Sequence, residues 1–179
     1  MLDRKDVPEN LKWKTTDIFN SDEECEKEYK EVEVEYSDYD FTVFKGKLGE
    51  KKALLDCFEL NDALSRRLER LYLYAHMRHD EDVRIAKYTS SHAIVGALIS
   101  KIFAELSFVE PELTALDDKL LQDFIDDPDF EAYEYRLRKI ADSKAHVLSE
   151  AEERLLTLGS DVMRDFQSVF SMLNNANLN

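Results

Sequence analysis

The sequence contains few of the residues that make turns. Its 179 residues include only four glycines and three prolines, while apolar residues make up 44% and charged residues 35%. A turn-rich β fold needs more glycine and proline, and a disordered chain has fewer apolar residues. A chain of this length buries roughly 70% of the surface that its unfolded form exposes. The composition therefore predicts an all-α fold with a sizeable core.

Basic charge, cysteine and long apolar runs are scarce as well. The formal net charge of −15 opposes binding to a phosphate backbone, which excludes nucleic acid as an expected partner. Cys25 and Cys57 are too few for a disulfide framework, so we expect two small buried hydrophobes in a reducing cytoplasm. We find no signal-peptide pattern and no run that approaches the roughly 18 apolar residues of a membrane span. The chain is expected to be cytoplasmic and without membrane contact.

The helical pattern divides residues 1–179, which we treat as a single domain, into an arm at 1–20, long helices at 21–110 and shorter helices from 111 onward. The first long helix begins at Ser21, with Glu24 at capping-box spacing. It places four apolar positions on one face, namely Cys25, Tyr29, Val32 and Tyr36. The segment 37–49 contains two glycines and is predicted to be a connection, extended at 41–44.

Two long antiparallel helices are predicted next. The first, at 50–79, has an apolar stripe at three- and four-residue steps: Leu54, Cys57, Phe58, Leu64, Leu68, Leu71, Tyr72 and Ala75. Its opposite face is charged, with Arg66, Arg67, Glu69 and Arg70. The acidic run at 80–82 suits the start of the second helix, which we expect at 81–107 and ended by Pro111. Its apolar positions are Ile94, Leu98, Ile102, Phe103 and Leu106.

Shorter helices are predicted at 116–127, 128–144 and 149–173. Pro128 suits a first helical turn, and Ser149 and Glu152 have capping-box spacing. The expected architecture is a multi-helix bundle of about six or seven helices that includes the long hairpin. The chain ends in "FSMLNNANLN" (170–179), an apolar cluster followed by the kind of turn signal that joins two elements, so this ending is expected to be an interruption.

Histidines and carboxylates near residue 80 are the one candidate for metal binding. His76 and His79 lie three residues apart beside the acidic run at 80–82, which could present two imidazoles and a carboxylate to a metal. Histidines are favoured near a helix C-terminus by the dipole alone, so we favour a structural role for this pair. His92 and His146 are interpreted as isolated core or surface residues. We predict no catalytic and no metal-binding residue, and we identify no substrate-binding residue.

The motifs of several enzyme classes are missing from the 179 residues. No H-E-x-x-H helix, no phosphate-binding Gly-x-x-x-x-Gly-Lys-Ser/Thr loop and no Gly-x-Ser-x-Gly elbow occurs. With 39 acidic residues, close carboxylate pairs are the background of an acidic surface rather than a sign of acid/base chemistry. The aromatic segment "LYLYAHM" (71–77) is interpreted as core packing.

Six blocks in a fixed order resemble the N-terminal region of the oligoendopeptidase F family. They are "WKTTDIF" (13–19), "FKGKL" (44–48), "RLYLYAHMRHDED" (70–82), "FVEPEL" (108–113), "HVLSEAEERLL" (146–156) and "FSMLNNANL" (170–178). Thr15 stands where the family usually has Leu. The resemblance runs over the whole chain.

The resemblance implies a function that lies partly outside these residues. Members of the family are cytoplasmic zinc endopeptidases of the thimet-oligopeptidase kind, which cut short peptides in a deep channel between two helical lobes. Residues 1–179 would then be the non-catalytic N-terminal domain, part of the wall or lid of that channel. The partners implied are the catalytic domain of the same polypeptide, which holds the zinc in its H-E-x-x-H helix, and the oligopeptide substrate. No catalytic or metal residue of the family matches a position here.

A second interpretation is a stand-alone helical interaction or scaffold module. Such a protein could form a homodimer that buries the segment 170–178 against its copy. A reading frame that continues past Asn179 to an H-E-x-x-H favours the peptidase domain. A stop codon directly after Asn179 favours the stand-alone module.

Overall fold

The computed structural model describes residues 7–144, and within this range the chain forms helices and no strand. The predicted all-α class is confirmed. The α-helices are α1 (Asp22–Ser37), α2 (Lys51–Glu81), α3 (Ala86–Glu105), α4 (Val109–Thr114), α5 (Asp118–Ile125) and α6 (Glu134–Lys144). Short 3₁₀ helices precede or separate them: η2 (Glu9–Leu11), η3 (Thr15–Asp17), η4 (Phe41–Phe44) and η5 (Pro128–Tyr133).

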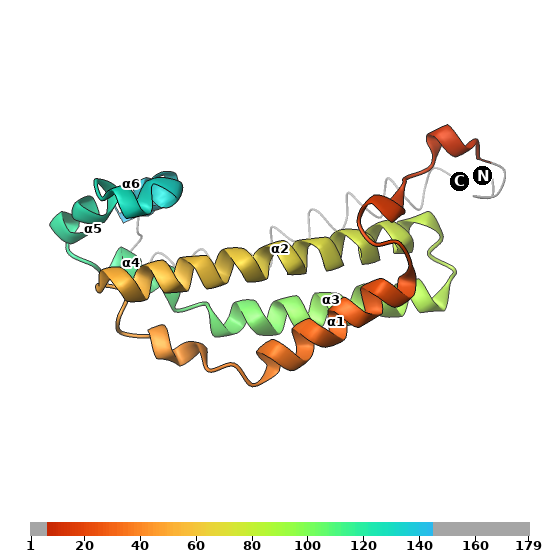
Figure 1. Ribbon diagram of the computed structural model, residues 1–179, viewed down its shortest axis with the longest axis horizontal. Helices are drawn as coiled ribbons and strands as arrows, with labels where there is room; N and C mark the ends of the chain where they lie inside the picture. The colour runs from red at the N-terminus through yellow and green to blue at the C-terminus, as the bar shows by residue number, and fades with distance from the viewer. Residues whose placement is uncertain (1–6, 145–179) are drawn as a thin grey trace, which may run out of the picture.

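The helices are arranged around the antiparallel pair of α2 and α3 (Figure 1). This pair is the predicted long helical hairpin. Helix α1 contacts both members of the pair. The N-terminal arm lies at the end of the hairpin where α2 turns into α3, and α4, α5 and α6 gather at the opposite end (Figure 1).

The start of α1 is set by local hydrogen bonds. The Ser21 hydroxyl accepts a 3.3 Å bond from the Glu24 amide, as the capping box predicts. The Glu24 carboxylate accepts from the Asn20 amide at 2.7 Å, one residue before the cap, instead of from Ser21 itself. The predicted apolar face is confirmed, since Cys25, Val32 and Tyr36 are buried and Tyr29 is half-buried.

The apolar stripe of α2 is buried along most of its length. Leu54, Phe58, Leu64, Leu68 and Leu71 expose 1% or less of their surface. The prediction is wrong at Tyr72, which is 42% exposed, while Tyr74 is buried. The arm and α1 cover the end of α2 on the side of Tyr74, whose ring packs edge-on against Phe19 at 5.5 Å between centroids.

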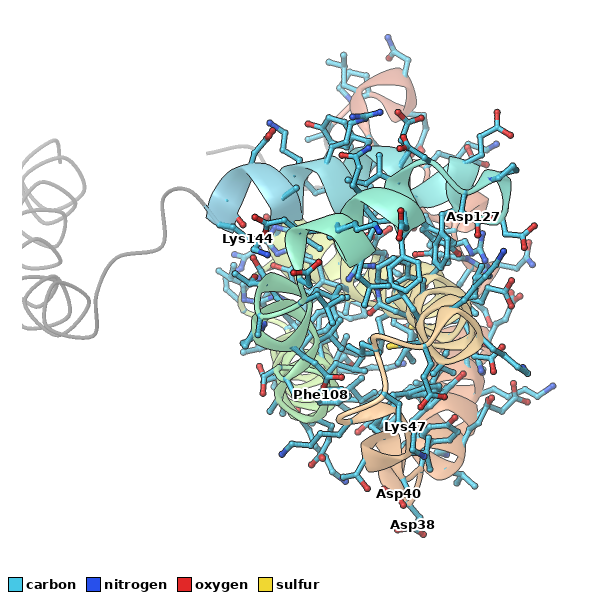
Figure 2. The ribbon with its side chains drawn as sticks, turned by 90° about the vertical axis from the view of Figure 1, so that its left-hand side faces the viewer. Asp38, Asp40, Lys47, Phe108, Asp127 and Lys144 are labelled. Carbon is cyan, nitrogen blue, oxygen red and sulfur yellow. The ribbon has the colours of Figure 1, made fainter. Side chains whose placement is uncertain are left out.

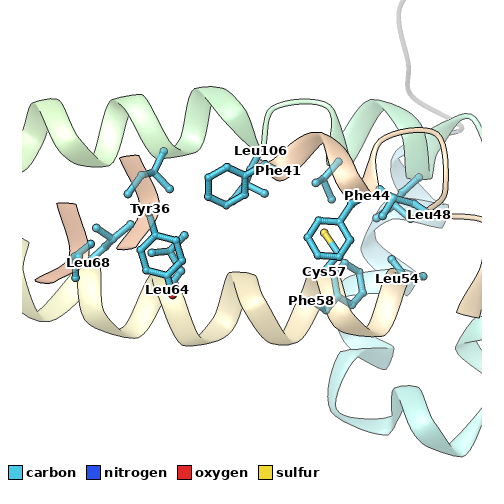
Figure 3. Packing of buried hydrophobic residues seen from close by; sticks show 14 of the residues in the cluster. Tyr36, Phe41, Phe44, Leu48, Leu54, Cys57, Phe58, Leu64, Leu68 and Leu106 are labelled. Atoms are coloured by element: carbon cyan, nitrogen blue, oxygen red, sulfur yellow. The ribbon is translucent and has the colours of Figure 1, made fainter. Parts of the chain in front are cut away.

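The segment before α2 was expected to be extended but forms the 3₁₀ helix η4. The Asp40 carboxylate accepts from the Thr42 amide at 3.0 Å and so favours a turn. Because a 3₁₀ helix has three residues per turn, Phe41 and Phe44 lie on one face, whereas a strand would place them on opposite faces. Both rings are buried, and Figure 3 shows them pointing into the space between α2 and α3.

The hairpin turn differs from the prediction. Helix α2 continues to Glu81 and α3 begins only at Ala86, so the acidic run ends one helix instead of starting the next. The Asp82 carboxylate accepts from the backbone amide of Arg84 at 3.0 Å and from its guanidinium at 2.8 Å, which stabilises the turn. In α3, Leu98 and Ile102 are buried as predicted, but Ile94 and Phe103 are about half exposed. Among the described residues, α3 packs against α2 and α1, so those two side chains remain uncovered.

Pro111 does not end the second long helix. The helix is interrupted earlier, at 106–108, and Pro111 lies in the first turn of α4, where its missing N–H needs no partner. If α3 and α4 are taken as one bent helix, the described residues hold five helices, slightly fewer than the six or seven expected. The helix predicted at 149–173 falls outside the described residues.

Helices α5 and α6 cover the start of α2, at the end of the molecule shown in Figure 2. Asp127 caps η5 through the Asp129 amide and accepts a 2.6 Å bond from Lys51 at the start of α2. Phe130 is fully buried. The centroid of its ring lies 5.2 Å from that of Phe124 and 6.5 Å from that of Phe58. The predicted helix at 128–144 is therefore present as η5 followed by α6.

Candidate functional site

Blocks that are distant in the sequence contact one another at the hairpin end. Arg70 donates a 2.8 Å hydrogen bond to the Ile18 carbonyl, and its guanidinium lies 4.7 Å from the centroid of the Phe19 ring. The segments 13–19 and 70–82 therefore pack together. The segments 44–48 and 108–113 are likewise joined, through Glu112. These four segments contribute to the stability of the fold.

Asp22, in the first turn of α1, connects three helices. Its carboxylate accepts from the Tyr74 hydroxyl of α2 at 2.8 Å and from the Lys87 ammonium of α3 at 2.9 Å. Arg78 Nε lies 3.4 Å from Asp22 Oδ1. Burial opposes ionisation of the carboxyl, but the bonds from Lys87 and Tyr74 and the charge of Arg78 outweigh it and lower the pKa of Asp22. Asp22 is therefore an ionised junction between α1, α2 and α3.

Arg78 is held on several sides. Its guanidinium lies 4.2 Å from the centroid of the Tyr88 ring and donates to the Tyr88 hydroxyl. Nη1 donates to the Glu81 carboxylate at 2.7 Å. Nε is buried and has no hydrogen-bond partner. Asp22 Oδ1 lies 3.4 Å away and forms an ion pair with it, but this contact does not have the geometry of a hydrogen bond. One N–H of a partly buried cation thus lacks an acceptor.

A pocket of about 210 Å³ lies beside this network, between α1, α2 and α3. Its floor is formed by buried side chains: Cys25, Tyr74, Ala75 and Val95. Its rim has charged and hydroxyl groups from all three helices: Asp22, Glu26, Lys30, Arg78, Lys87, Tyr88 and Ser91. An apolar floor with a few placed polar groups is typical of a ligand site. We therefore take this pocket as the candidate functional site.

A larger hollow of about 780 Å³ lies over α1 and is a shallow groove with mostly charged walls. Arg67 closes part of it by donating to Glu28 at 2.7 Å and to Glu35 at 2.5 Å. Arg67 was expected on a plain charged face of α2, yet it joins α2 to α1. This groove lacks the buried floor of the pocket.

The structure gathers the histidines more closely than the sequence suggests. His92 of α3, which was expected to be isolated, has its ring centroid 5.2 Å from His76 and 5.1 Å from His79 of α2. The Asp80 carboxylate lies 3.4 Å from His76 Nε2 and 3.0 Å from His79 Nδ1. Tyr72 stacks on His76 at 5.4 Å. The segment 71–77 thus supplies both core residues and an exposed aromatic cluster.

This histidine cluster is not arranged as a metal site. In the range 7–144 no group of three His, Cys, Asp or Glu side chains could hold a metal ion. Asp82, the third acidic residue of the run, pairs with Arg84 instead. The residues described here therefore do not fit the zinc that the family resemblance implies. His146 lies outside the described residues, as does the segment 170–178.

Both cysteines are free, buried thiols. Burial, reinforced by Asp22, Glu26 and Glu28, raises the pKa of Cys25 to about 11. Burial also raises the pKa of Cys57. Their expected role as small buried hydrophobes is confirmed.

One helical stretch in the described part of the chain, at 86–114, is long and apolar enough to cross a membrane by length and composition. This differs from the expectation that no run approaches the length of a membrane span. A core helix also meets these criteria, and one such helix is weak evidence of a span. Of the qualifying window 28% is buried, and Val95, Leu98 and Ile102 of this stretch belong to the helical core. This finding alone does not indicate a membrane span.

Patterns along the sequence do not single out Asp22, Arg78 or Tyr88 as members of a site. The three come from α1, α2 and α3, so no spacing along the chain relates them. The acidic first turn of α1 and the charged end of α2 were the only signals present.

Comparison with known proteins identifies the family. A family model described as Oligopeptidase F matches residues 112–179. The chain is 36% identical over 177 residues to the group B oligopeptidase PepB of Streptococcus agalactiae, covering 98% of this chain and 29% of that protein. It is 33% identical over 178 residues to the oligopeptidase PepF of Bacillus subtilis, covering 98% of this chain and 26% of that protein.

Solved structures agree with this assignment. The crystal structure of oligoendopeptidase-F from Enterococcus faecium matches 92% of this chain and 30% of its own, with a TM-score of 0.57 and 30% identity. A structure from Chlamydophila abortus matches 95% of this chain and 29% of its own, with a TM-score of 0.75, and at 21% identity it supports the fold alone. The chain thus spans less than a third of the relatives that it matches. It belongs to the oligoendopeptidase F family and corresponds to the N-terminal region of that family.

Proposed function

We propose that residues 1–179 act as the non-catalytic N-terminal helical domain of a zinc-dependent oligoendopeptidase. The single observation that carries this proposal is the match of 98% of the chain to under a third of two oligopeptidases. The remaining two thirds of such a protein would supply the catalytic domain. The zinc would be held there by an H-E-x-x-H helix, a motif that these 179 residues lack.

The domain forms part of the wall or lid of the channel that admits short peptides. An endopeptidase limited to short peptides needs rigid walls that accept an extended chain and exclude folded proteins. The hairpin of α2, 31 residues long, and α3, 20 residues long, supplies a stiff element of this kind. Its role is to restrict substrate length and assist closure, while the chemistry belongs to the catalytic domain.

The partner that we propose for this domain is the catalytic domain of the same polypeptide. The chain matches 29% and 26% of the length of two oligopeptidases, so most of such a protein lies outside the matched region. The free thiols of Cys25 and Cys57 suit a reducing cytoplasm, which is the proposed location.

The test compares an intact enzyme with a form that lacks this domain. Both are given a series of peptides of increasing length and one unfolded protein, and cleavage is followed by mass spectrometry. The truncated enzyme is first shown to fold and to bind zinc. We expect it to cut longer substrates than the intact enzyme does, relative to its activity on the shortest peptide. An unchanged length limit would contradict the proposed gate.

A further inference from the structure

The pocket between α1, α2 and α3 has the size of a site for one side chain. Its volume is about 210 Å³. Sites that take drug-sized ligands have volumes of roughly 300–1,000 Å³, so this pocket is too small for a nucleotide or a large cofactor. It is large enough for a single apolar or aromatic group that enters between the helices.

The floor favours an apolar group. Tyr74, Ala75 and Val95 expose 6%, 2% and 3% of their surfaces, and Cys25 lies beside them with its thiol protonated because its pKa is raised. An apolar side chain that enters the pocket leaves water and contacts carbon and sulfur atoms. Transfer of apolar surface out of water is the main driving force of such binding.

The rim contains a hydrogen-bond donor that has no acceptor. Arg78 Nε carries an N–H that is buried and lacks a hydrogen-bond acceptor, although Asp22 Oδ1 lies 3.4 Å away. The other nitrogens of the same guanidinium donate to Glu81 and Tyr88. A buried donor without an acceptor is unfavourable. A carbonyl oxygen at the rim would satisfy it once the guanidinium turns toward the pocket, because Nε has almost no exposed surface in this structure. Among the other rim charges, Lys87 is paired, because it lies 2.9 Å from Asp22 and 3.5 Å from Glu26. Arg78 Nε thus offers an unused donor next to an apolar floor.

We propose that this pocket binds one large apolar side chain of an oligopeptide, whose backbone carbonyl accepts a hydrogen bond from Arg78 Nε. An apolar side chain and a carbonyl oxygen a few bonds away are the two features that every hydrophobic residue of a peptide offers. The peptide as ligand rests on the proposed function. The pocket would then hold substrate outside the catalytic domain and contribute to the choice among short peptides.

The first experiment measures binding to the full 179-residue chain. Three fluorescently labelled pentapeptides differ only at the central residue, which is Phe, Ala or Asp, and fluorescence anisotropy gives their affinities. We expect the Phe peptide to bind at least tenfold more tightly than the Ala and Asp peptides. Equal affinities, or no binding of the Phe peptide at millimolar concentration, would overturn the proposal.

Two variants of α3 provide a matched pair. Ser91 lines the pocket and is half-buried, whereas Ser90 is exposed and lies outside the lining. Ser91→Trp should fill the pocket and weaken binding of the Phe peptide at least tenfold, while Ser90→Trp should leave it within twofold. Circular dichroism confirms that each variant is folded. Equal effects of the two substitutions would contradict the proposal.

A second measurement needs no variant. A pentapeptide with a photoreactive benzophenone side chain at its centre is crosslinked to the unmodified chain, and the sites are mapped by mass spectrometry. Crosslinks to 25–30, 74–78 and 87–95 are expected. Crosslinks elsewhere would overturn the pocket assignment but leave the proposed function standing, because the latter depends on the length limit of the intact enzyme.

Discussion

Glu112 in α4 accepts a 2.8 Å hydrogen bond from the backbone amide of Leu48, 64 residues earlier in the chain. Its second oxygen accepts a 2.8 Å bond from the amide of Gly46. Gly46 has a φ of +77°, a conformation that glycine adopts without strain, and the turn directs both amides toward one carboxylate. One acidic side chain thus fixes the loop that precedes α2.

Removal of this carboxylate should loosen the loop. Glu112→Ala leaves two amides without an acceptor, and hydrogen bonds to charged groups contribute about 1.5–3 kcal/mol each when buried. Since the Gly46 amide is exposed, we expect a total loss of about 1–3 kcal/mol in the free energy of unfolding, measured in urea. Glu110→Ala, in the same helix but exposed, is the control and should change stability by about 0.5 kcal/mol or less. Equal losses for both variants would contradict the role of Glu112.

The centre of α2 should be sensitive to truncation. Leu71 is 0% exposed, so Leu71→Ala should cost about 2–5 kcal/mol in the free energy of unfolding, because it removes apolar contacts and leaves a cavity. Leu73, two residues away and 48% exposed, is the control for the same chemical change. Leu73→Ala should cost about 0.5 kcal/mol, the level of surface positions. A loss below about 0.5 kcal/mol at Leu71 would mean that the stripe is not in the core.

Asp22 should make the stability depend on pH. Its pKa in the folded chain lies below the ordinary value of 3.8, so its ionised form stabilises the fold above that pH, and this contribution is lost as the pH falls through the lowered pKa. Asp22→Asn should therefore cost about 1 kcal/mol at pH 7, a figure reduced for the partial exposure of the site. The difference from the unmodified chain should shrink below pH 3.8.

The control for this pH dependence is Asp123→Asn, at an exposed position of α5. Urea unfolding at several pH values is compared for the three proteins. The Asp123 variant should follow the unmodified chain at every pH. A constant difference between Asp22→Asn and the unmodified chain from pH 7 to pH 2.5 would show that the ionisation of Asp22 is not the cause.

The two thiols should be unreactive in the folded chain. At pH 8 a thiol with a pKa of about 11 is ionised in about one molecule per thousand, and only the thiolate attacks. Ellman's reagent should therefore modify Cys25 at least about 100-fold more slowly than in the chain unfolded by urea. Cys57, which is 1% exposed, should behave in the same way. Rapid modification of either thiol at its unfolded-state rate would contradict the burial described.

The purified 179-residue chain should neither hold one zinc ion per chain nor cleave peptides. The H-E-x-x-H motif is missing from the sequence. Residues 7–144 contain no group of three His, Cys, Asp or Glu side chains that could hold a metal ion. Elemental analysis and incubation with a peptide mixture test this directly. A variant with His76 and His79 both changed to Ala serves as the control, because it shows whether any residual metal is held by the histidine cluster. One tightly held zinc per unmodified chain would contradict the expectation.

Much of the fold follows from interactions between residues that are close in the sequence. Ser21 and Glu24 start α1 through hydrogen bonds that span four residues or fewer. The periodicity of Leu54, Leu64 and Leu71 selects the buried face of α2, because residues three and four apart share one face of a helix. These features were predicted correctly from the sequence because their causes are local.

Where a helix is covered could not be predicted in the same way. Tyr72 and Tyr74 are similar in the sequence, and only the position of the arm and α1 determines that Tyr74 is buried. The interruption of α3 at 106–108 likewise comes before the proline that was expected to cause it.

The candidate site is the feature that depends most on tertiary structure. The helical class, the hairpin and the family resemblance can be predicted from the sequence alone, because each depends on patterns along the chain. The pocket lies between α1, α2 and α3. On its rim, Lys87 donates a hydrogen bond to Asp22, which is 65 residues earlier in the chain. Such pairs are brought together by the packing of whole helices, and the spacing of residues along one helix contains no information about them.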